Sequence, residues 1–489
     1  MRRRVDSILV SRNEALSQQE SVLKNLLQYG ELTEYGARYQ FDRINDREDF
    51  KLRVPLVNYP VIQEDIERMR SGAVDVLWPG QVQWYAKSSG TTSGVSKFIP
   101  VSKENIEECH FAGGKAELAL YCAYCPDTKM FEGLGLRLGG STDIHESDAS
   151  KFGDLSAILI QNMPLWAESV SAPSQEVALM SDWNEKIEAL AQECMTKNIT
   201  SFWGVSSWFL VFAHHVLEKT GKSNLHEVWP NLELFAHGGV NFGPYRSQFE
   251  KLLPKGITFL ENYNASEGFF AVQDHPKAEG MLLLTDAGVY FEFITMSAFD
   301  GLKSPTIGLG DVELGVDYAL VITTNSGLWR YLIGDTVQFT SLDPFRIIVS
   351  GRTAHYINAF GEEVIVSDAE NALRVACEKT DATVIDFHAA PIYLQGKTSG
   401  AHQWLVEFGQ PPKDISVFID ALDNALKEEN SDYAAKRQHD ILLKRPELTI
   451  AKQGLYQQWL AQKGKLGGQH KVPRLSNSRT LMEEFLMLN

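Results

Sequence analysis

Cysteine is scarce in this chain: five occur among 489 residues. They are too few and too irregularly spaced for a disulfide framework. Cys122 and Cys125 form a C-x-x-C pair, but no second pair stands at the spacing of zinc ligands. We therefore expect two small residues on a helix there and no zinc site.

Long hydrophobic runs are absent as well. No run approaches the roughly 18 apolar residues that cross a bilayer. Arg2, Arg3 and Arg4 stand at the N-terminus, but no apolar signal core follows them. We expect a cytoplasmic protein without a membrane partner.

Basic residues are outnumbered, 46 against 63 acidic ones, which gives a formal net charge of −17. An acidic body repels phosphate backbones, so no nucleic-acid partner is expected. One segment differs. From Lys436 to Arg474 nine basic residues stand against Asp440 and Glu447, a local excess of seven positive charges. This excess becomes meaningful if a phosphate site lies elsewhere in the chain.

The remaining composition is that of a folded globular protein, with 44% hydrophobic and 22% charged residues. The length exceeds the usual size of one domain, so at least two are expected. We expect an α/β fold with an N-terminal domain over 1–355 and a small α+β domain over 356–489.

The segment 232–263 predicts a β-α-β unit. Apolar strands at 232–236 and 257–260 flank an amphipathic helix that Pro244 opens. Polar, glycine-containing stretches follow both strands. Ligands of parallel sheets bind beyond the carboxyl ends of strands, so these stretches are candidate binding loops.

Later segments predict hairpins. Strands at 281–285 and 289–294 are separated by Asp-Ala-Gly, and strands at 318–324 and 328–332 by Asn-Ser-Gly. From about residue 365 the pattern changes to helix, strand, strand and helix. We place a hinge at about 352–362.

A hydroxyl-rich loop at 88–94, Ser-Ser-Gly-Thr-Thr-Ser-Gly, follows a predicted strand. Glycine admits anions close to the backbone, and hydroxyls donate to phosphate oxygens. Lys97 follows and adds charge. On its own such a loop is more often a flexible connection than a site.

Two carboxylates stand in similar contexts. Glu267 beside Ser266 suits a Mg²⁺ bridged to phosphates, and Asp335 suits two ribose hydroxyls. Taken alone, either is more often an ordinary turn residue.

Together these segments resemble a known family. The motifs are SSGTTSGVSKFIPVS (88–102), HGGVNFGPY (237–245), YNASEG (263–268), YLIGD (331–335) and HKVPR (470–474). In this order they resemble the acyl acid–amido synthetases, within the adenylate-forming superfamily, whose plant members include jasmonoyl- and indoleacetyl-amino acid synthetases. The resemblance covers nearly the whole chain.

The resemblance implies a large adenylate-forming domain of helix-covered sheets with a barrel-like part, and a mobile C-terminal lid. It implies an ATP- and Mg²⁺-dependent ligase that converts a carboxylic acid to an acyl-adenylate and pyrophosphate. An amine, usually of an amino acid, then displaces AMP. A monomer or weak dimer is expected.

The resemblance also implies roles for individual residues. Lys471 would be the mobile catalytic lysine, and Glu267 would act in catalysis and hold Mg²⁺. The nucleotide would be bound by Ser88, Ser89, Thr91, Thr92, Gly239, Tyr263, Asn264, Ser266, Asp335 and Arg352.

The acyl pocket is implied less sharply, because aromatic residues also build cores. The candidates are Trp203, Val205, Trp208, His237, Gly238, Tyr290 and Phe291. For His237 the alternative is a buried structural histidine.

One motif departs from the family pattern. Leu332 stands where the family commonly has arginine, and Arg330 lies two residues earlier. Residues two apart on a strand share a face but not a position, so Arg330 does not simply replace the missing side chain.

Two other functions stay open. An acyl-CoA ligase would use a thiol acceptor, and a non-catalytic acyl- or nucleotide-binding protein would keep the fold. A serine hydrolase is disfavoured, because no G-x-S-x-G nucleophile elbow accompanies His-Gly-Gly.

Overall fold

The computed structural model describes residues 2–88, 97–139, 144–147, 149–180, 182–353, 356–394, 399–440, 442–463 and 472–489. Of residues 2, 3, 88, 183, 244 and 367 only the backbone is described. In this part of the chain no helix is long and apolar enough to span a bilayer.

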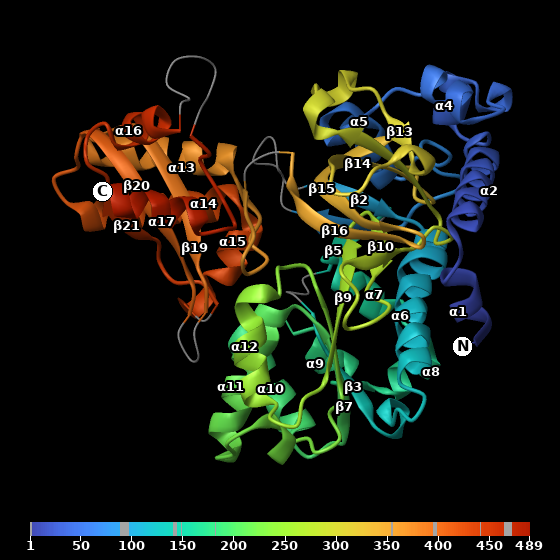
Figure 1. Ribbon diagram of the computed structural model, residues 1–489, viewed down its shortest axis with the longest axis horizontal. Helices are drawn as coiled ribbons and strands as arrows, with labels where there is room; N and C mark the ends of the chain where they lie inside the picture. The colour runs from blue at the N-terminus through green and yellow to red at the C-terminus, as the bar shows by residue number, and fades with distance from the viewer. Residues whose placement is uncertain are drawn as a thin grey trace.

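A sheet of twelve strands forms the centre of the molecule (Figure 1). Its order is β13-β12-β14-β15-β16-β11-β10-β9-β8-β7-β3-β6. The strands are β3 (Leu134–Leu138), β6 (Ser171–Ala172), β7 (Ile199–Gly204), β8 (Leu234–Gly238), β9 (Thr258–Ala265), β10 (Gly268–Val272), β11 (Met281–Leu283), β12 (Val289–Thr295), β13 (Ile307–Gly308), β14 (Asp317–Thr324), β15 (Tyr331–Leu342) and β16 (Phe345–Arg352).

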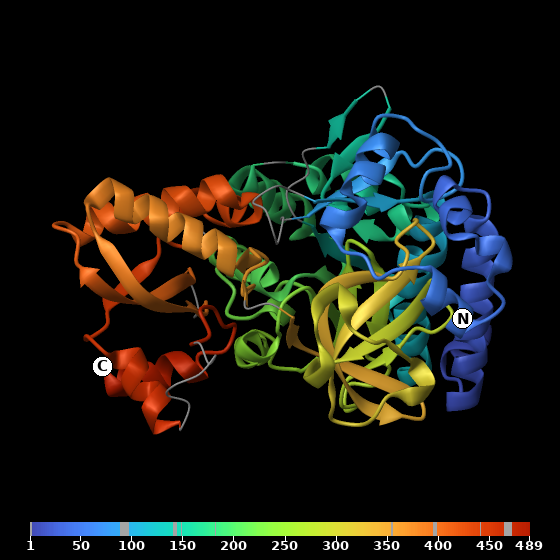
Figure 2. The same cartoon turned by 90° about the horizontal axis from the view of Figure 1, so that it is seen from above.

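The sheet changes sense at β9. This strand pairs in parallel with β8 on one side and antiparallel with β10 on the other. From β9 to β6 all pairs are parallel, and from β9 to β13 all are antiparallel. The antiparallel part curls into a barrel-like body (Figure 2). An α/β fold with a barrel-like part is therefore confirmed.

Helices cover both faces of the parallel part. On one face the aromatic side chains of β7 and β8 pack with α11 and α12. On the other, α6 packs against Leu234 and Leu260. The helices of this region are α6 (Phe111–Tyr124), α7 (Leu155–Gln161), α8 (Leu165–Ser169), α9 (Gln175–Ala178), α10 (Trp183–Cys194), α11 (Ser206–Thr220) and α12 (Gly243–Leu252).

A small sheet, β2-β1-β5-β4, lies beside the main one. Its strand β2 leads into a helical segment at Ser102, whose Oγ accepts a hydrogen bond from the amide of Asn105 at 3.0 Å, as an N-cap does. Its strands are β1 (Trp84–Ser88), β2 (Lys97–Val101), β4 (His145–Glu146) and β5 (Lys151–Gly153), and the N-terminal helices are α1 (Arg2–Ile8), α2 (Arg12–Gly30), α3 (Glu34–Tyr39), α4 (Arg47–Arg53) and α5 (Tyr59–Arg70).

The C-terminal part is an α+β unit. Its sheet, β19-β20-β21, has α13–α15 on one face and α16 and α17 on the other (Figure 2). The elements are β17 (Tyr356–Ile357), β18 (Val364–Ile365), α13 (Val366–Thr380), β19 (Thr383–Ile392), β20 (Ala401–Gln410), α14 (Ile415–Glu429), α15 (Ser431–Lys436), β21 (Glu447–Ile450), α16 (Leu455–Gln462) and α17 (Thr480–Leu488).

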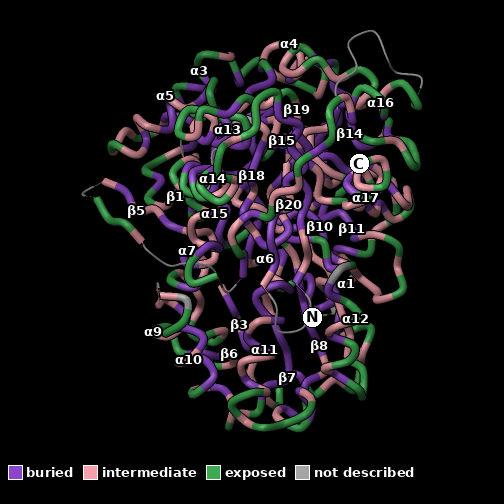
Figure 3. Tube along the Cα trace, turned by 90° about the vertical axis from the view of Figure 1, so that its left-hand side faces the viewer, coloured by how far each residue is buried: buried purple, intermediate pink, exposed green. Residues whose placement is uncertain are grey.

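The buried side chains form two large clusters (Figure 3). One fills the barrel-like body and the N-terminal helices. The other continues from α10–α12 into α13 and α14 of the C-terminal unit. The boundary between 355 and 356 stays a prediction, because buried packing crosses it.

One predicted hairpin is wrong. The strands before and after Asp286-Ala287-Gly288 do not pair with each other: β11 pairs with β10 and β16, and β12 pairs with β13 and β14. After this turn the chain instead crosses the barrel-like body to β12, which three strands separate from β11 in the sheet order. The second hairpin is confirmed, since Ile322 of β14 is paired with Tyr331 of β15.

Candidate active site

A polar cavity of about 1,200 Å³ lies where the sheet changes sense. Its walls come from the end of β9, from β15 and β16, and from the C-terminal unit. It is lined by most of the predicted nucleotide-binding residues that the structure describes, namely Gly239, Tyr263, Asn264, Ser266, Asp335 and Arg352, and by the predicted metal ligand Glu267.

Strand β9 delivers its side chains to this cavity directly. Thr258–Ala265 is continuous strand, and Ser266 and Glu267 form the turn to β10. The strand extends beyond its predicted end at residue 260, because the polar residues Asn262 and Asn264, which suggest a loop, belong to it. Asn264 is fixed by its Oδ1, which lies 3.0 Å from Nδ1 of His110.

Asp335 lies at the centre of a buried hydrogen-bond network. Tyr263 donates its hydroxyl to Oδ2, and Arg352 donates from Nε to Oδ1 at 2.7 Å. Arg352 also forms an ion pair with Glu363 of the C-terminal unit. One guanidinium thus connects the main sheet to the C-terminal unit.

Glu267 is a buried carboxylate in the same cavity. Burial raises its pKa to about 7, and the nearby Lys97 opposes that rise. Burial in turn lowers the pKa of Lys97, against the effect of Glu267 and Glu363. A cation beside Glu267 would stabilise its ionised form.

No cluster of three or more His, Cys, Asp or Glu suited to a metal occurs in the described part of the chain. A lone carboxylate still fits Mg²⁺, which is usually held by one or two carboxylates and by substrate phosphates. Glu267 meets that requirement because it is buried and lines the polar cavity.

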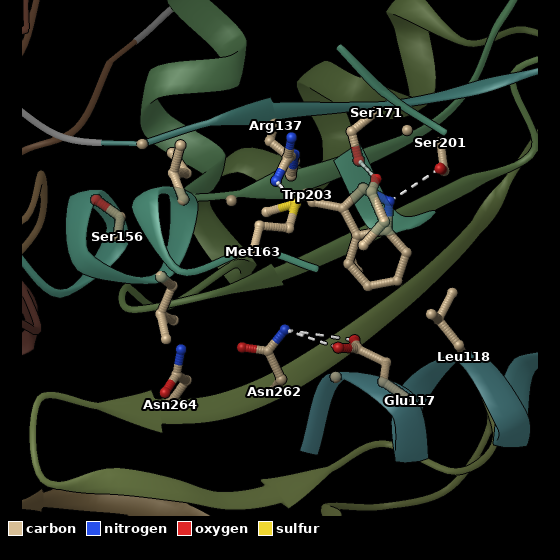
Figure 4. Close-up of a pocket in the computed structure, with 18 of the residues that line it drawn as sticks. Glu117, Leu118, Arg137, Ser156, Met163, Ser171, Ser201, Trp203, Asn262 and Asn264 are labelled. Atoms are coloured by element: carbon tan, nitrogen blue, oxygen red, sulfur yellow. Dashed lines mark hydrogen bonds between the residues drawn. The ribbon is translucent and has the colours of Figure 1, made fainter. Parts of the chain in front are cut away.

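A second, mostly apolar cavity of about 450 Å³ adjoins the first. Gly239, Asn262 and Asn264 line both cavities, so they form the wall between the two. Four predicted acyl-binding residues line it: Trp203, Val205, Trp208 and Gly238. Figure 4 shows Trp203, with Nε1 donating to Ser201 Oγ at 2.9 Å.

Three other acyl candidates do not line this cavity. Tyr290 and Phe291 belong to β12 in the barrel-like core, where the Tyr290 ring packs 6.1 Å from that of Phe50. The prediction that they line the pocket is wrong, because β12 pairs with β14, far along the sheet from β9.

His237 is buried against aromatic side chains. Its ring stacks on Phe242 with centroids 4.0 Å apart, and burial lowers its pKa to about 3. Neighbouring residues on a strand face opposite sides, so His237 faces α12 while Gly238 faces the cavity. Its place as an acyl-binding residue was wrong, and the alternative of a structural histidine fits.

Two charged residues of the apolar cavity were not indicated by the sequence. Glu117 of α6 and Arg137 of β3 both line it. Burial raises the pKa of Glu117 to about 8, and Asn262 Nδ2 donates to both of its oxygens at 3.3 Å. In the sequence each lies among apolar residues without a recognised motif.

The C-terminal unit supplies further residues that the sequence did not indicate. Ser476, Asn477 and Arg479 line the polar cavity. Asn477 accepts a hydrogen bond from the amide of Asn358 at 2.6 Å. These residues follow a strand-like segment that pairs with β19 through Ala389 and Leu475.

Five predicted site residues cannot be placed. Ser89, Thr91, Thr92 and Lys471 lie outside the described residues, and so does the side chain of Ser88. Their roles stay predictions. Lys97, just after the hydroxyl-rich loop, lines the polar cavity.

Arg330 is a structural residue. It binds Glu292 with Nε and Nη2 at 2.9 Å each and donates to the carbonyl of Val54 at 2.7 Å. Both partners of the ion pair are buried. It does not reach Asp335, so Leu332 leaves this protein without the usual arginine.

Three family models cover most of the chain. The N-terminal domain of the GH3 family matches residues 4–257, its central domain 282–352 and its C-terminal domain 367–480. The chain belongs to the GH3 family. The first model alone covers more than half of its residues.

Curated relatives are distant, and they match this chain over different shares of its length. Indole-3-acetic acid-amido synthetase GH3.3 of Arabidopsis thaliana is 23% identical, over 95% of this chain and 90% of its own length. Jasmonoyl–L-amino acid synthetase JAR4 of Nicotiana attenuata is 24% identical, over 65% of this chain and 66% of its own.

Solved structures show the same fold. GH3.15 acyl acid amido synthetase in complex with 2,4-DB aligns with a TM-score of 0.62 at 19% identity, covering 99% of this chain and 94% of that one. A 2-hydroxyisobutyryl-CoA ligase aligns with a TM-score of 0.50 at 13% identity, covering 97% and 92%.

Proposed function

We propose that this GH3 protein is an ATP-dependent acyl acid–amido synthetase. The observation that carries the proposal is the contact of two unlike cavities at Gly239, Asn262 and Asn264. An apolar cavity suits an acid, and the polar one suits a nucleotide. A carboxylate at their shared wall would meet the α-phosphate.

The first step joins two anions, so it needs donors and positive charge around the phosphates. Asp335 would bind the ribose hydroxyls, held in place by Tyr263 and Arg352. The hydroxyls of Ser88, Ser89, Thr91 and Thr92 would bind phosphate oxygens. Lys97 and the basic C-terminal segment would supply positive charge.

Magnesium would be held by Glu267 and by the phosphates of ATP. The ion supplies charge neutralisation at the triphosphate when bound. The raised pKa of Glu267 supports this role, because a buried carboxylate without a cation is costly to ionise.

The second step would transfer the acyl group to an amine, that of an amino acid, with release of AMP. The family membership and the names of the relatives support an amine acceptor. A thiol acceptor is the second candidate, since a CoA ligase shares the fold. Both reactions begin with the same adenylate.

The test begins with ATP–pyrophosphate exchange across aromatic, indolic and fatty acids, with Mg²⁺ and without an acceptor. We expect exchange that depends on the acid. AMP release with amino acids but not with coenzyme A would select the amide-forming reaction. Lack of exchange with any acid, while ATP still binds, would contradict the proposal and favour a binding protein.

Lys471 is tested in the same assay. Lys471→Ala is expected to slow exchange, since it removes a cation from the reacting phosphates. The matched control is Lys452→Ala, an exposed lysine of the same basic segment. Equal exchange rates in the two variants would remove Lys471 from the mechanism. A cytoplasmic monomer or weak dimer remains part of the proposal.

A further inference from the structure

Arg137 places a positive charge inside the apolar acyl cavity. It lies on β3, where it is paired with Trp203 of β7. Figure 4 shows its side chain across the cavity from Asn262 and Asn264. The other described walls nearby are apolar or small, as Gly135, Leu138 and Ile160 illustrate.

The described chain gives this guanidinium little to bind. Its buried Nε has no hydrogen-bond partner among the described residues. One Nη contacts the sulfur of Met163, which is a weak acceptor. No ion pair to Arg137 occurs among the described residues, and the acidic group that acts on it is the exposed Glu168.

Arg137 is nevertheless charged. Burial lowers its pKa only to about 10. Glu117, the acidic residue among the described residues that line the cavity, does not neutralise it, because burial keeps Glu117 largely protonated near neutral pH. A cation in an apolar cavity without a matched anion is costly unless a ligand supplies one.

Arg137 lies on the side of the cavity away from the strand that forms most of the shared wall. The wall shared with the polar cavity is formed by residues of β9 and by Gly239 after β8. In the sheet order β9-β8-β7-β3, Arg137 stands three strands from β9. At ordinary strand spacing this is about 14 Å between backbones.

The nearby hydroxyls already have partners. Ser171 Oγ donates to the carbonyl of Ala167 at 2.6 Å, and Ser201 Oγ accepts from Trp203 Nε1. Arg137 is therefore the charged donor on this side of the cavity, since Lys115, the other lysine or arginine that lines it, is an exposed residue of α6.

We propose that Arg137 binds a second anionic group at the far end of the acyl substrate. The preferred acids would then carry two acidic groups, one activated at the shared wall and one held by Arg137. This inference rests on the proposed function for the identity of the cavity as the acyl site.

The experiment compares straight-chain α,ω-dicarboxylates of six to ten carbons with the monocarboxylates of equal length. For the fitting length we expect kcat/KM in pyrophosphate exchange to favour the dicarboxylate by about tenfold or more, the usual range for a hydrogen bond between charged groups. Arg137→Met keeps a long side chain but removes the charge. We expect it to abolish or reverse the preference while it retains exchange with the monocarboxylates.

Glu168→Gln is the matched control. It removes the exposed carboxylate that acts on Arg137 and leaves the cavity unchanged. The preference for dicarboxylates should persist or increase, because a competing negative charge is gone. If both variants lose stability equally and neither changes the preference, Arg137 is a structural partner of Glu168 and the inference is overturned.

Calorimetric binding of the same acid pairs separates this inference from the proposed function, because it needs no turnover. Tighter dicarboxylate binding to the native protein but not to Arg137→Met, without exchange on any acid, would support Arg137 and contradict the synthetase. Exchange on monocarboxylates, with no preference for dicarboxylates of any length, would support the synthetase and contradict the role of Arg137. Absence of both binding and exchange would overturn both.

Discussion

Arg352 donates from Nε to Oδ1 of Asp335 at 2.7 Å, and the two residues are register partners on β15 and β16. Tyr263 occupies the other carboxylate oxygen from β9. Three strands therefore fix one carboxylate at the wall of the polar cavity. A carboxylate held in this way can accept from two ribose hydroxyls without first being ordered.

Asp335→Asn should raise the KM for ATP. The loss of charge-assisted hydrogen bonds to ribose predicts a rise of roughly 10- to 150-fold. The KM is measured from pyrophosphate exchange at varied ATP concentration. Asp317→Asn is the control, because this carboxylate is exposed on neighbouring β14 and only accepts from Gln338 at 3.2 Å. An unchanged KM in Asp335→Asn would remove ribose binding from its role.

Arg352 also holds the C-terminal unit through Glu363, with side-chain exposures of 19% and 16%. Glu363→Gln should loosen the segment from β17 to β18, because a partly buried ion pair is lost. Hydrogen exchange of its amides should accelerate roughly five- to tenfold, as expected for a local loss of about 1 kcal/mol. Glu378→Gln removes an exposed pair with Arg374 and should leave these amides unchanged. Equal exchange in both variants would contradict a connecting role.

Replacement of Glu267 by glutamine is expected to raise the stability of the protein and to abolish its activity. The pKa of Glu267 rises from 4.5 to about 7 on folding. Between these values the folded state holds more protons than the unfolded state, so stability falls as pH rises. Glu267→Gln removes this penalty, and its advantage in free energy of unfolding should grow from about 1 kcal/mol at pH 5 to about 3 kcal/mol at pH 8.

The same substitution should abolish Mg²⁺-dependent adenylation, since an amide does not replace the carboxylate ligand. Urea unfolding at the two pH values and pyrophosphate exchange test the two halves. A variant that is less stable than the native protein at pH 8, or one with full exchange activity, would contradict the assigned environment or the assigned role.

The predicted nucleotide-binding residues that the structure describes line one cavity because most of them lie in contiguous motifs. Tyr263, Ser266 and Glu267 follow one another at the end of β9, and Asp335 lies on the adjacent antiparallel part. Local patterns decide where such strands end. Even so, β9 extends five residues beyond the predicted end, to Ala265, because its pairing with β8 and β10 outweighs the polar character of its asparagines.

The acyl cavity was predicted less well because it is made by packing between distant segments. Glu117 and Arg137 meet the same space only when α6 covers the sheet. The prediction for Tyr290 differs from the structure for a related reason, because the order of strands in a sheet is not visible in the sequence. The wrong hairpin around residues 286–288 had the same origin, since a turn signal does not state which strands pair.

A substitution of Arg330 tests whether this residue replaces the arginine that the family motif commonly has at position 332. Arg330 is 5% exposed, has a backbone φ of 47°, and binds Glu292 through two nitrogens. Arg330→Met leaves Glu292 buried and unpaired, which should cost about 3–5 kcal/mol of unfolding free energy. The KM for ATP of the folded fraction should not change, because Arg330 lies outside the polar cavity. Pairing the change with Glu292→Met should recover most of the lost stability in urea unfolding. A large rise in the KM for ATP without loss of stability would instead show that Arg330 takes the place of the arginine that is missing at position 332.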